Sequence, residues 1–284
     1  MWFSSWLRNR TSNPGARGQS QRRSGARRFR PRLEPLEDRY LPSTLTVTNN
    51  LNSGRGSLRY EIAHAQNKDT IVFAPSLDGQ TITLTSGELD ITAKSLTIDG
   101  PGANQLTVSG GHNSRVFEVA STSSVTLSGL TISNGYSVDG AAILNAGALT
   151  VTGCTVSDSF ATNFGGGICN AGTLTVSGCS LFGNTAVDAG GGIYNAGSAT
   201  VSNSTLGNAT LQNSTDGEGG GIYNRGMLTV SGCTLSGNSA SVHGGGIYNA
   251  GTASALKVSN SVFSFNPPEN IFGPYTDGGG NTFS

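Results

Sequence analysis

The amino-acid sequence predicts an all-β protein, a single-stranded right-handed parallel β-helix (a solenoid) with about 25 residues per coil and a short N-terminal capping helix. A glycine-rich hexapeptide recurs at a nearly fixed interval. Each copy is followed by a segment in which apolar and hydroxyl residues alternate, which is the period of a half-buried strand. With 42 glycines and 12% charged residues among 284, the composition suits short strands and tight turns and argues against helical bundles.

The hexapeptide sets the length of the coil, because successive copies start 25, 25, 29 and 25 residues apart. The pieces GIYN, LTV and CTL predict three short strands per coil, with bends between them. Such coils bury their apolar face inside and pair with the coils above and below at about 4.8 Å. The predicted hand is right because parallel crossovers are right-handed. The copies are GAAILN at 140–145, GGGICN at 165–170, and GGGIYN at 190–195, 219–224 and 244–249.

Weaker versions of the repeat precede residue 140 and extend the predicted β-helix to 81–266, which allows about seven coils. They are GELDI from Gly87, SLTIDG from Ser95, QLTVSG from Gln105, RVFEVA from Arg115 and VTLSGLTISNG from Val125.

Both ends of a β-helix expose core and unpaired strand edges, so we expect a cap at each end. Residues 44–80 are predicted to form the N-terminal cap, in which Ser57 is the N-cap of a short helix. Residues 267–284 are predicted to form the C-terminal cap. The apolar positions on one face of the helix are Leu58, Ile62 and Ala65.

Residues 1–43 differ in kind, with ten arginines against three acidic residues, so this segment carries about +7 and the remainder about −7. It is rich in Arg, Ser, Gly and Pro and is expected to be disordered. A basic arm can bind nucleic acid through counterion release, which stays a third possibility. The remainder has no basic stripe, so no nucleic-acid partner is expected. No apolar run approaches the roughly 20 residues that cross a bilayer, so no transmembrane helix is expected.

The end of this segment, RPRLEPLEDRYLPS at 30–43, resembles the N-terminal motif of secreted and surface proteins of planctomycete bacteria, LEPLEDR followed by an apolar pair. Tyr40 and Leu41 stand where the family has two leucines. The resemblance implies an export or sorting address and therefore a secreted, cell-surface or extracellular location.

Two further resemblances concern the remainder of the chain. Residues 46–73, with GSLR followed by DTIVF, look like the N-terminal module of bacterial surface β-helix proteins. The repeats are similar to those of polymorphic outer-membrane-protein passengers and pectin-lyase-like surface proteins, but they carry GGGI for GGA(I/L/V), and FxxN only as FGNT at 182–185. These resemblances imply the fold and no single activity, because the fold carries adhesins, polysaccharide lyases and hydrolases alike.

Equivalent residues of successive coils should form columns along the helix axis. One column is the asparagine that ends each hexapeptide, and we expect its amides to bond to one another and cap the turn. The preceding glycines indicate a turn that needs a positive φ or a close backbone approach. The ladder asparagines are Asn145, Asn170, Asn195, Asn224 and Asn249.

A second column contains cysteines. Cys154, Cys179 and Cys233 alternate with valines, so they should face inward as small buried side chains. Ser204 and Ser261 occupy the same position in other coils. Cys154 and Cys179 could be close enough to bridge, although the serines show that the column does not need a disulfide. No CxxC or Cys/His spacing is present, and neither a metal nor a cofactor is expected.

The candidate catalytic residues are Asp216, Glu218 and His243. Glu218 and His243 both precede a glycine triplet, which predicts neighbouring rungs about 5 Å apart. Ten residues separate Asn208 from Gly219 where neighbouring coils use five, and lengthened loops often carry function. The competing interpretation is a solvated turn, and we favour it because nothing visible positions two carboxylates for glycoside hydrolysis.

Tyr194, Tyr223 and Tyr248 form a column that should face outward as an aromatic ladder. Such a ladder could bind sugar rings, although stacking between coils is the preferred interpretation.

The leading functional hypothesis is a non-catalytic exported protein at the cell surface or outside the cell, which presents an extended surface for adhesion or envelope contacts. Its partner would be a cell-envelope or extracellular polysaccharide, or a surface protein. The alternative is a polysaccharide lyase or glycoside hydrolase of the pectin-lyase-like fold. The lack of a dense Asp, Glu and Arg cluster in the sequence favours the first.

Overall fold

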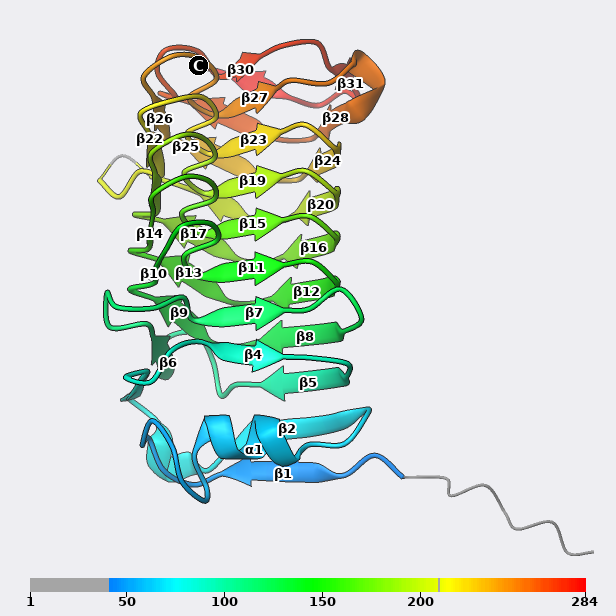
Figure 1. Cartoon of the computed structure of the whole chain (residues 1–284). Coiled ribbons are helices and arrows are strands. Elements are labelled where there is room, and N and C mark those ends of the chain that lie inside the picture. The colour runs from blue at the N-terminus through cyan, green and yellow to red at the C-terminus, as the bar shows by residue number, and fades with distance from the viewer. Residues whose placement is uncertain (1–40, 209) are drawn as a thin grey trace, which may run out of the picture. The chain divides into compact units, whose positions relative to one another are not determined.

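A computed structural model describes residues 41–208 and 210–284, so the predicted Arg-rich export segment lies outside the described residues except for 41–43. Within these residues the chain winds as a parallel β-helix (Figure 1), and every strand pairing joins a strand to its equivalent one coil away. The predicted fold class is therefore confirmed. The strands form four sheets of ten, nine, eight and five members in the described residues, which we call sheets A, B, C and D.

Sheet A is built from the LTV segments and is longer than predicted, because its first strands lie in residues 44–80 and its last beyond residue 266. The sequence thus underestimates the number of coils. The strands of sheet A are β1 (Thr44–Val47), β2 (Asp69–Phe73), β5 (Ser95–Asp99), β8 (Ser124–Ser128), β12 (Ala148–Thr152), β16 (Thr173–Ser177), β20 (Ser198–Ser202), β24 (Met227–Ser231), β28 (Leu256–Ser259) and β31 (Thr276–Asp277).

Sheets B and C contain the CTL and GIYN segments. Sheet B consists of β3 (Gln80–Thr83), β6 (Leu106–Ser109), β9 (Thr131–Ser133), β13 (Thr155–Ser157), β17 (Ser180–Phe182), β21 (Thr205–Leu206), β25 (Thr234–Ser236), β29 (Val262–Ser264) and β32 (Thr282–Phe283). Sheet C consists of β4 (Leu89–Ile91), β7 (Phe117–Val119), β11 (Ile143–Asn145), β15 (Ile168–Asn170), β19 (Ile193–Asn195), β23 (Ile222–Asn224), β27 (Ile247–Asn249) and β30 (Ile271–Phe272).

Sheet D is the part of the coil that the sequence does not reveal. Its two-residue strands are too short to show an alternation of apolar and polar residues, so a regular coil has four strands where three are predicted. The strands of sheet D are β10 (Tyr136–Ser137), β14 (Phe160–Ala161), β18 (Thr185–Ala186), β22 (Ser214–Thr215) and β26 (Ser239–Ala240).

The predicted capping helix is confirmed as α1 (Leu58–His64). The Ser57 hydroxyl accepts a hydrogen bond from the backbone N–H of Tyr60 at 3.2 Å, which satisfies a free donor of the first turn. Leu58, Ile62 and Ala65 are buried on one face of this helix, as expected. Two single 3₁₀ turns, Pro75–Leu77 and Ala253–Ala255, complete the helical elements of the described residues.

The core is one continuous apolar column inside the coils. In β12 the side chains of Leu149 and Val151 point inward and are 2% and 0% exposed, while Thr150 between them points outward. The same alternation holds in the LTV strands above and below. Each inward side chain packs on its equivalents in neighbouring coils, so burial repeats with the coil.

The glycine triplets carry out both of the predicted roles, at different positions of the triplet. The first glycine of each has a positive φ, for example +70° at Gly190. A Cβ on the second glycine, Gly191, would collide with the backbone oxygen of Ser214 in the next coil. The triplet therefore makes a tight turn and lets two coils approach closely.

The five asparagines at the ends of the sheet C strands form a continuous ladder. In the first four, Nδ2 donates to the Oδ1 of the next coil at 2.7 or 2.8 Å and also to a backbone carbonyl of the following turn. Asn249 ends the ladder, and its Nδ2 donates to the backbone carbonyl of Pro274. The amides from Asn145 to Asn224 are completely buried, and Asn249 is 3% exposed. The ladder thus fixes the register of the coils and satisfies the backbone at the turn between sheets C and A.

A second asparagine ladder, which we did not predict, follows the turn between sheets B and D. Asn184, Asn213, Asn238 and Asn266 donate to one another's Oδ1 atoms in sequence, at 2.9 to 3.0 Å. Each Nδ2 also donates to a backbone carbonyl of the preceding coil. The ladder stops at Ser159, and Asn184 Oδ1 is a buried acceptor without a partner in the described structure.

Replacing Asn195 by alanine should lower the free energy of unfolding by about 2–5 kcal/mol, because Asn170 Nδ2 and Asn224 Oδ1 each lose a buried partner. Chemical denaturation measures the change. Thr200→Ala on the outer face of β20 is the control, with an expected change of about 0.5 kcal/mol or less. Equal losses in the two variants would contradict a role for the ladder.

Replacing Ser159 by asparagine should extend the second ladder by one coil. The new Nδ2 would donate to Asn184 Oδ1, and the new Oδ1 would accept from the Gly135 N–H that now bonds to Ser159 Oγ. We expect a gain of about 1 kcal/mol in the free energy of unfolding. Ser198→Asn on the outer face of β20 is the control, and a loss of stability at residue 159 would argue against the proposed geometry.

Candidate functional site

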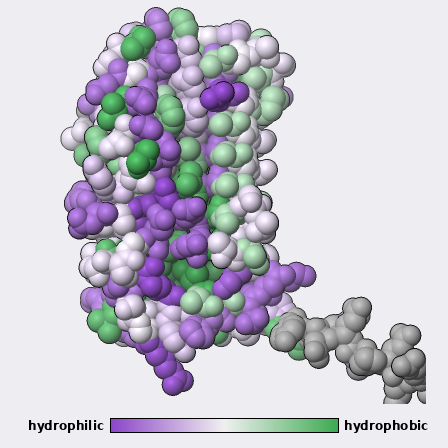
Figure 2. All heavy atoms as spheres, in the orientation of Figure 1, coloured by the Kyte–Doolittle hydropathy of each residue, from purple (hydrophilic) through white to green (hydrophobic). Residues whose placement is uncertain are grey.

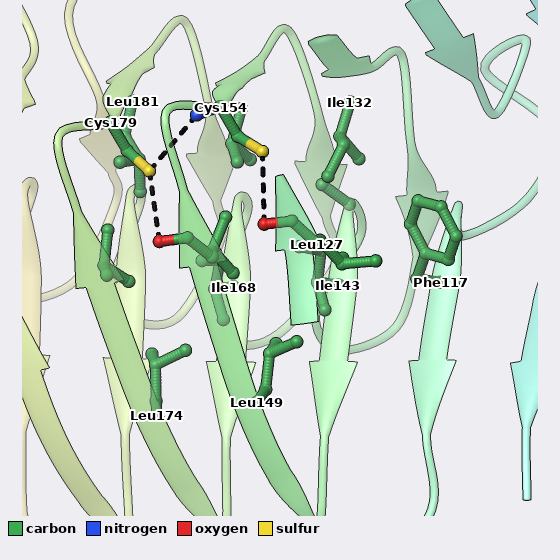
Figure 3. Close-up of a cluster of buried hydrophobic side chains, with 14 of the residues drawn as sticks. Phe117, Leu127, Ile132, Ile143, Leu149, Cys154, Ile168, Leu174, Cys179 and Leu181 are labelled. Atoms are coloured by element: carbon green, nitrogen blue, oxygen red, sulfur yellow. Dashed lines mark hydrogen bonds between the residues drawn. The ribbon is translucent and has the colours of Figure 1, made fainter. Parts of the chain in front are cut away.

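The cysteine column is structural. Cys154 and Cys179 lie side by side in the core (Figure 3), and all four cysteines are free thiols. Cys154 Sγ donates to the carbonyl of Leu127 in the preceding coil, and Cys179 Sγ donates likewise to that of Val151. Burial raises the pKa of the Cys154 thiol to about 12. A thiol that stays neutral at physiological pH is a poor nucleophile and a poor metal ligand.

The candidate catalytic residues lie on neighbouring coils without forming a catalytic arrangement in the described structure. The N–H of Gly219 bonds to the carbonyl of His243, so Glu218 and His243 are on adjacent coils as predicted. However, His243 Nδ1 lies 3.3 Å from Glu269 Oε1, and no hydrogen bond or ion pair joins His243 to Glu218 among the described residues. Asp216 is exposed.

The lengthened loop lies further from Glu218 than the sequence suggested. Asn213, and not Asn208, is the register equivalent of Asn184, because these two amides are bonded in the second ladder. The extra residues therefore fall between β21 and β22, in the loop that projects at the left of Figure 1. From β22 onward the coil is regular, so the loop does not surround Glu218.

The tyrosine column is a stack of rings that continues beyond the three predicted members. Tyr194, Tyr223 and Tyr248 stack in order with ring centroids 5.1 Å apart and planes within 14° of parallel. Phe164 extends the stack at one end with a centroid distance of 4.6 Å, and Phe272 extends it at the other with 5.3 Å.

This stacking limits what the aromatic ladder can bind. The faces of the inner rings are covered by the neighbouring rings. Tyr194 is buried and its hydroxyl accepts a hydrogen bond from Arg225 Nη1 at 3.3 Å, so only the edges of Tyr223 and Tyr248 reach solvent. Sugar rings bind aromatic side chains by their faces, which these rings use for one another. Burial, and then the charge of Glu218, raises the pKa of Tyr223, so the hydroxyl stays protonated. The outer edge therefore presents the hydroxyl groups of Tyr223 and Tyr248 on neighbouring coils.

Below this ladder, sheet C carries a charged cluster that sequence reasoning missed. Arg115 Nη1 donates to Glu88 Oε2 at 2.8 Å and to Glu118 Oε2 at 2.6 Å. Its other nitrogens donate to the backbone carbonyls of Asp139 and Gly140 and to a serine hydroxyl. Figure 2 shows hydrophilic side chains gathered near β7 on this face. The guanidinium side chain is only 11% exposed, so this arrangement is rigid.

A cavity of about 160 Å³ adjoins the cluster and is lined by Arg59, Glu88 and Asp90, among others. Arg59 donates to the backbone carbonyls of Gly87 and Glu88 and thereby holds this turn against helix α1. Burial raises the pKa of the Glu88 carboxyl, Arg115 opposes the shift, and the neighbouring Glu118 adds to it through its charge and a hydrogen bond.

The chemistry of the cluster is that of two carboxyl groups beside one cation. A raised pKa on one of two neighbouring carboxyl groups favours sharing of a proton, which is an arrangement that acid–base catalysis uses. The signal in the sequence was the outward column of sheet C. Extending the tyrosine column backward from Leu144 gives Glu118, its register partner, and then Asp90, the register partner of Glu118.

In the part of the chain that the structure describes, no three His, Cys, Asp or Glu side chains gather closely enough to hold a metal ion. None of the helices within 41–208 and 210–284 has the length and apolar character that crossing a bilayer requires.

The parallel coils, the buried ladders and the outward columns define a pectin-lyase-like parallel β-helix protein. A family model described as the right-handed β-helix region matches residues 81–263, which is more than half of the chain. The protein therefore belongs to the right-handed β-helix family, and the predicted hand is confirmed. No curated protein matches the chain significantly.

Replacing Glu88 by glutamine should change how stability depends on pH. Because the folded pKa of Glu88 is raised above 4.5, its contribution to stability is present below that pH and is lost as pH rises through the folded pKa. Glutamine cannot ionise at residue 88, so the free energy of unfolding of the variant, relative to that of the wild type, should rise as pH increases above 4.5. Denaturation at a series of pH values measures this trend.

The control is Asp188→Asn at an exposed turn, where the described structure shows no ion pair. It should show no comparable trend. If the wild type gained stability over Glu88→Gln as pH increased, the two glutamates would not be crowded in the way described.

Proposed function

We propose that the protein is an exported, non-catalytic β-helix protein that presents extended outer faces at the cell surface or outside the cell. The observation that carries the proposal is where the repeated residues go. The asparagines bond to asparagines, the cysteines are buried, and the tyrosines stack on tyrosines of the next coil. The repeat thus serves the solenoid, and what it offers to other molecules is a long, rigid surface.

The partner would be a polysaccharide of the envelope or extracellular space, or a surface protein. The hydroxyl edges of Tyr223 and Tyr248 and the exposed Arg225 guanidinium, which bonds to the Tyr194 hydroxyl, supply hydrogen bonds along the axis, which supports contact with a polar partner. The export motif at 30–43 supports the location.

Catalysis is the second candidate, and the charged cluster is the observation that favours it. Glu88 and Glu118 beside Arg115 supply a pair of carboxyl groups that can share a proton next to a cation, which is acid–base chemistry of the kind a polysaccharide-cleaving enzyme uses. The charged cluster is a better candidate site than Asp216, Glu218 and His243, because hydrogen bonds from Arg115 hold Glu88 and Glu118 together.

Cell fractionation tests the proposed location. We expect the mature protein in the surface or extracellular fraction, with an N terminus that sequencing of the purified protein defines. Recovery in the cytosolic fraction alone would contradict an exported surface protein.

A panel of polyuronides and neutral glycans separates the two candidate functions. We expect no cleavage by the wild-type protein. If cleavage occurs and is lost in both Glu88→Gln and Glu118→Gln but kept in Glu218→Ala, the protein is an enzyme and its site is the charged cluster. Cleavage that is lost only in Glu218→Ala would instead assign the catalytic site to Asp216, Glu218 and His243.

A further inference from the structure

The outer face of sheet A between β8 and β24 is a grid of hydroxyl groups. Five coils each place three side chains outward here, and all are Ser or Thr except Ala148 and Met227. None of the fifteen side chains is buried. The central column pairs coil by coil without a bulge. Its members are Thr126, Thr150, Thr175, Thr200 and Thr229.

The grid is free of charge and of aromatic rings, and charged residues stand at its two ends. Asp99 is the register partner of Ser128 in the coil before it, and Lys257 is the partner of Thr229 in the coil after it. Sheet B carries a single comparable column, and its short strands place no second or third outward column beside it. The members of that column are Thr131, Thr155, Ser180, Thr205 and Thr234. At equivalent outward positions of sheet C the same solenoid carries Glu118, Leu144 and the stacked tyrosines.

The grid is also regular and preorganised. Strands of neighbouring coils are about 4.8 Å apart, and outward residues two apart along a strand are separated by roughly 6.7 Å. The central threonines are half-buried at four of five positions, because each packs against its equivalents above and below. β-branched side chains have few rotamers, so the hydroxyl and methyl groups are held in place before any partner arrives.

These properties restrict the chemistry of a partner. A face without charge suits an uncharged partner. Sugars are usually bound by aromatic faces and by amide or charged side chains, and the grid has none of these. A rigid lattice of threonine hydroxyl and methyl groups instead suits an ordered layer of water. The two spacings of the threonine lattice approach the repeats of oxygen atoms on the faces of a hexagonal ice crystal that run parallel to the long axis of the crystal.

We propose that the outer face of sheet A between β8 and β24 binds ice. The hydroxyl groups hydrogen-bond to lattice water, and the methyl groups order the water between them. Because the face belongs to the same rigid solenoid, adsorption requires no folding step. The inference concerns a face that the proposed function does not use, and it stands whether or not the protein is an enzyme.

The test uses the full chain in an ice recrystallisation assay, together with microscopy of crystals grown in its presence. The wild-type protein should keep ice grains small and facet single crystals. The variant Thr150→Lys with Thr175→Lys, on adjacent coils at the centre of the grid, should need a concentration roughly tenfold higher for the same effect. The matched control is Thr205→Lys with Thr234→Lys, on adjacent coils of sheet B, which should behave as the wild type.

A second variant covers the case in which the lysine pair does not fold. Thr150→Tyr with Thr175→Tyr adds bulk without charge, and neighbouring aromatic residues on a sheet stabilise it. It should also lose the effect on ice.

The proposal would be overturned if the wild-type protein inhibited ice recrystallisation no better than serum albumin, or if the sheet A and sheet B variants lost this inhibition equally. It would also be overturned if the wild-type protein were a dimer that the sheet A variants dissociate, because the grid would then be a dimer interface. Binding of the wild type to insoluble cellulose or chitin that the sheet A variants abolish would assign the grid to a polysaccharide instead.

Discussion

The bonding of each coil to the next is the constraint on which the rest of this structure depends. A 25-residue unit cannot bury its apolar face or satisfy its backbone alone, so every unit needs a neighbour in strict register. Parallel backbone pairing supplies attraction but would tolerate a slip of the register. The buried amide ladders remove that tolerance, because a shifted coil would leave completely buried asparagine side chains such as Asn170 and Asn195 without partners.

What could be predicted from the sequence follows from that register. Residues that repeat at the period of the coil fall into columns, so the sheet C asparagines, the inward cysteines and the tyrosine stack were accessible from alignment of the repeats alone. The second ladder was equally accessible, because Asn184, Asn213 and Asn238 each stand six residues before a glycine triplet. It was missed because Asn208, and not Asn213, was counted as the residue that opens the segment before Gly219. Once Asn213 is recognised as the partner of Asn184, the insertion also moves away from Glu218.

The charged cluster was missed for a different reason. Its residues lie in the less regular coils before residue 140, and Arg115 reaches Glu88 across a coil and Glu118 within its own turn. Column alignment predicts which residues share an outward face, but the direction of a long arginine side chain is decided by the acceptors around it. Here the carbonyls of Asp139 and Gly140 fix the guanidinium between the two carboxyl groups.

The outer faces of the solenoid therefore differ in chemistry while the interior stays uniform. Sheet C changes along the axis from charged to aromatic, whereas sheet A keeps a neutral hydroxyl surface over five coils. The most direct measurement of the register on which both depend is hydrogen exchange of the asparagine side-chain amides by NMR. Exchange at Asn170, Asn195 and Asn224 should be orders of magnitude slower than at exposed Asn203. Equal rates at all four would contradict a buried, axis-spanning ladder.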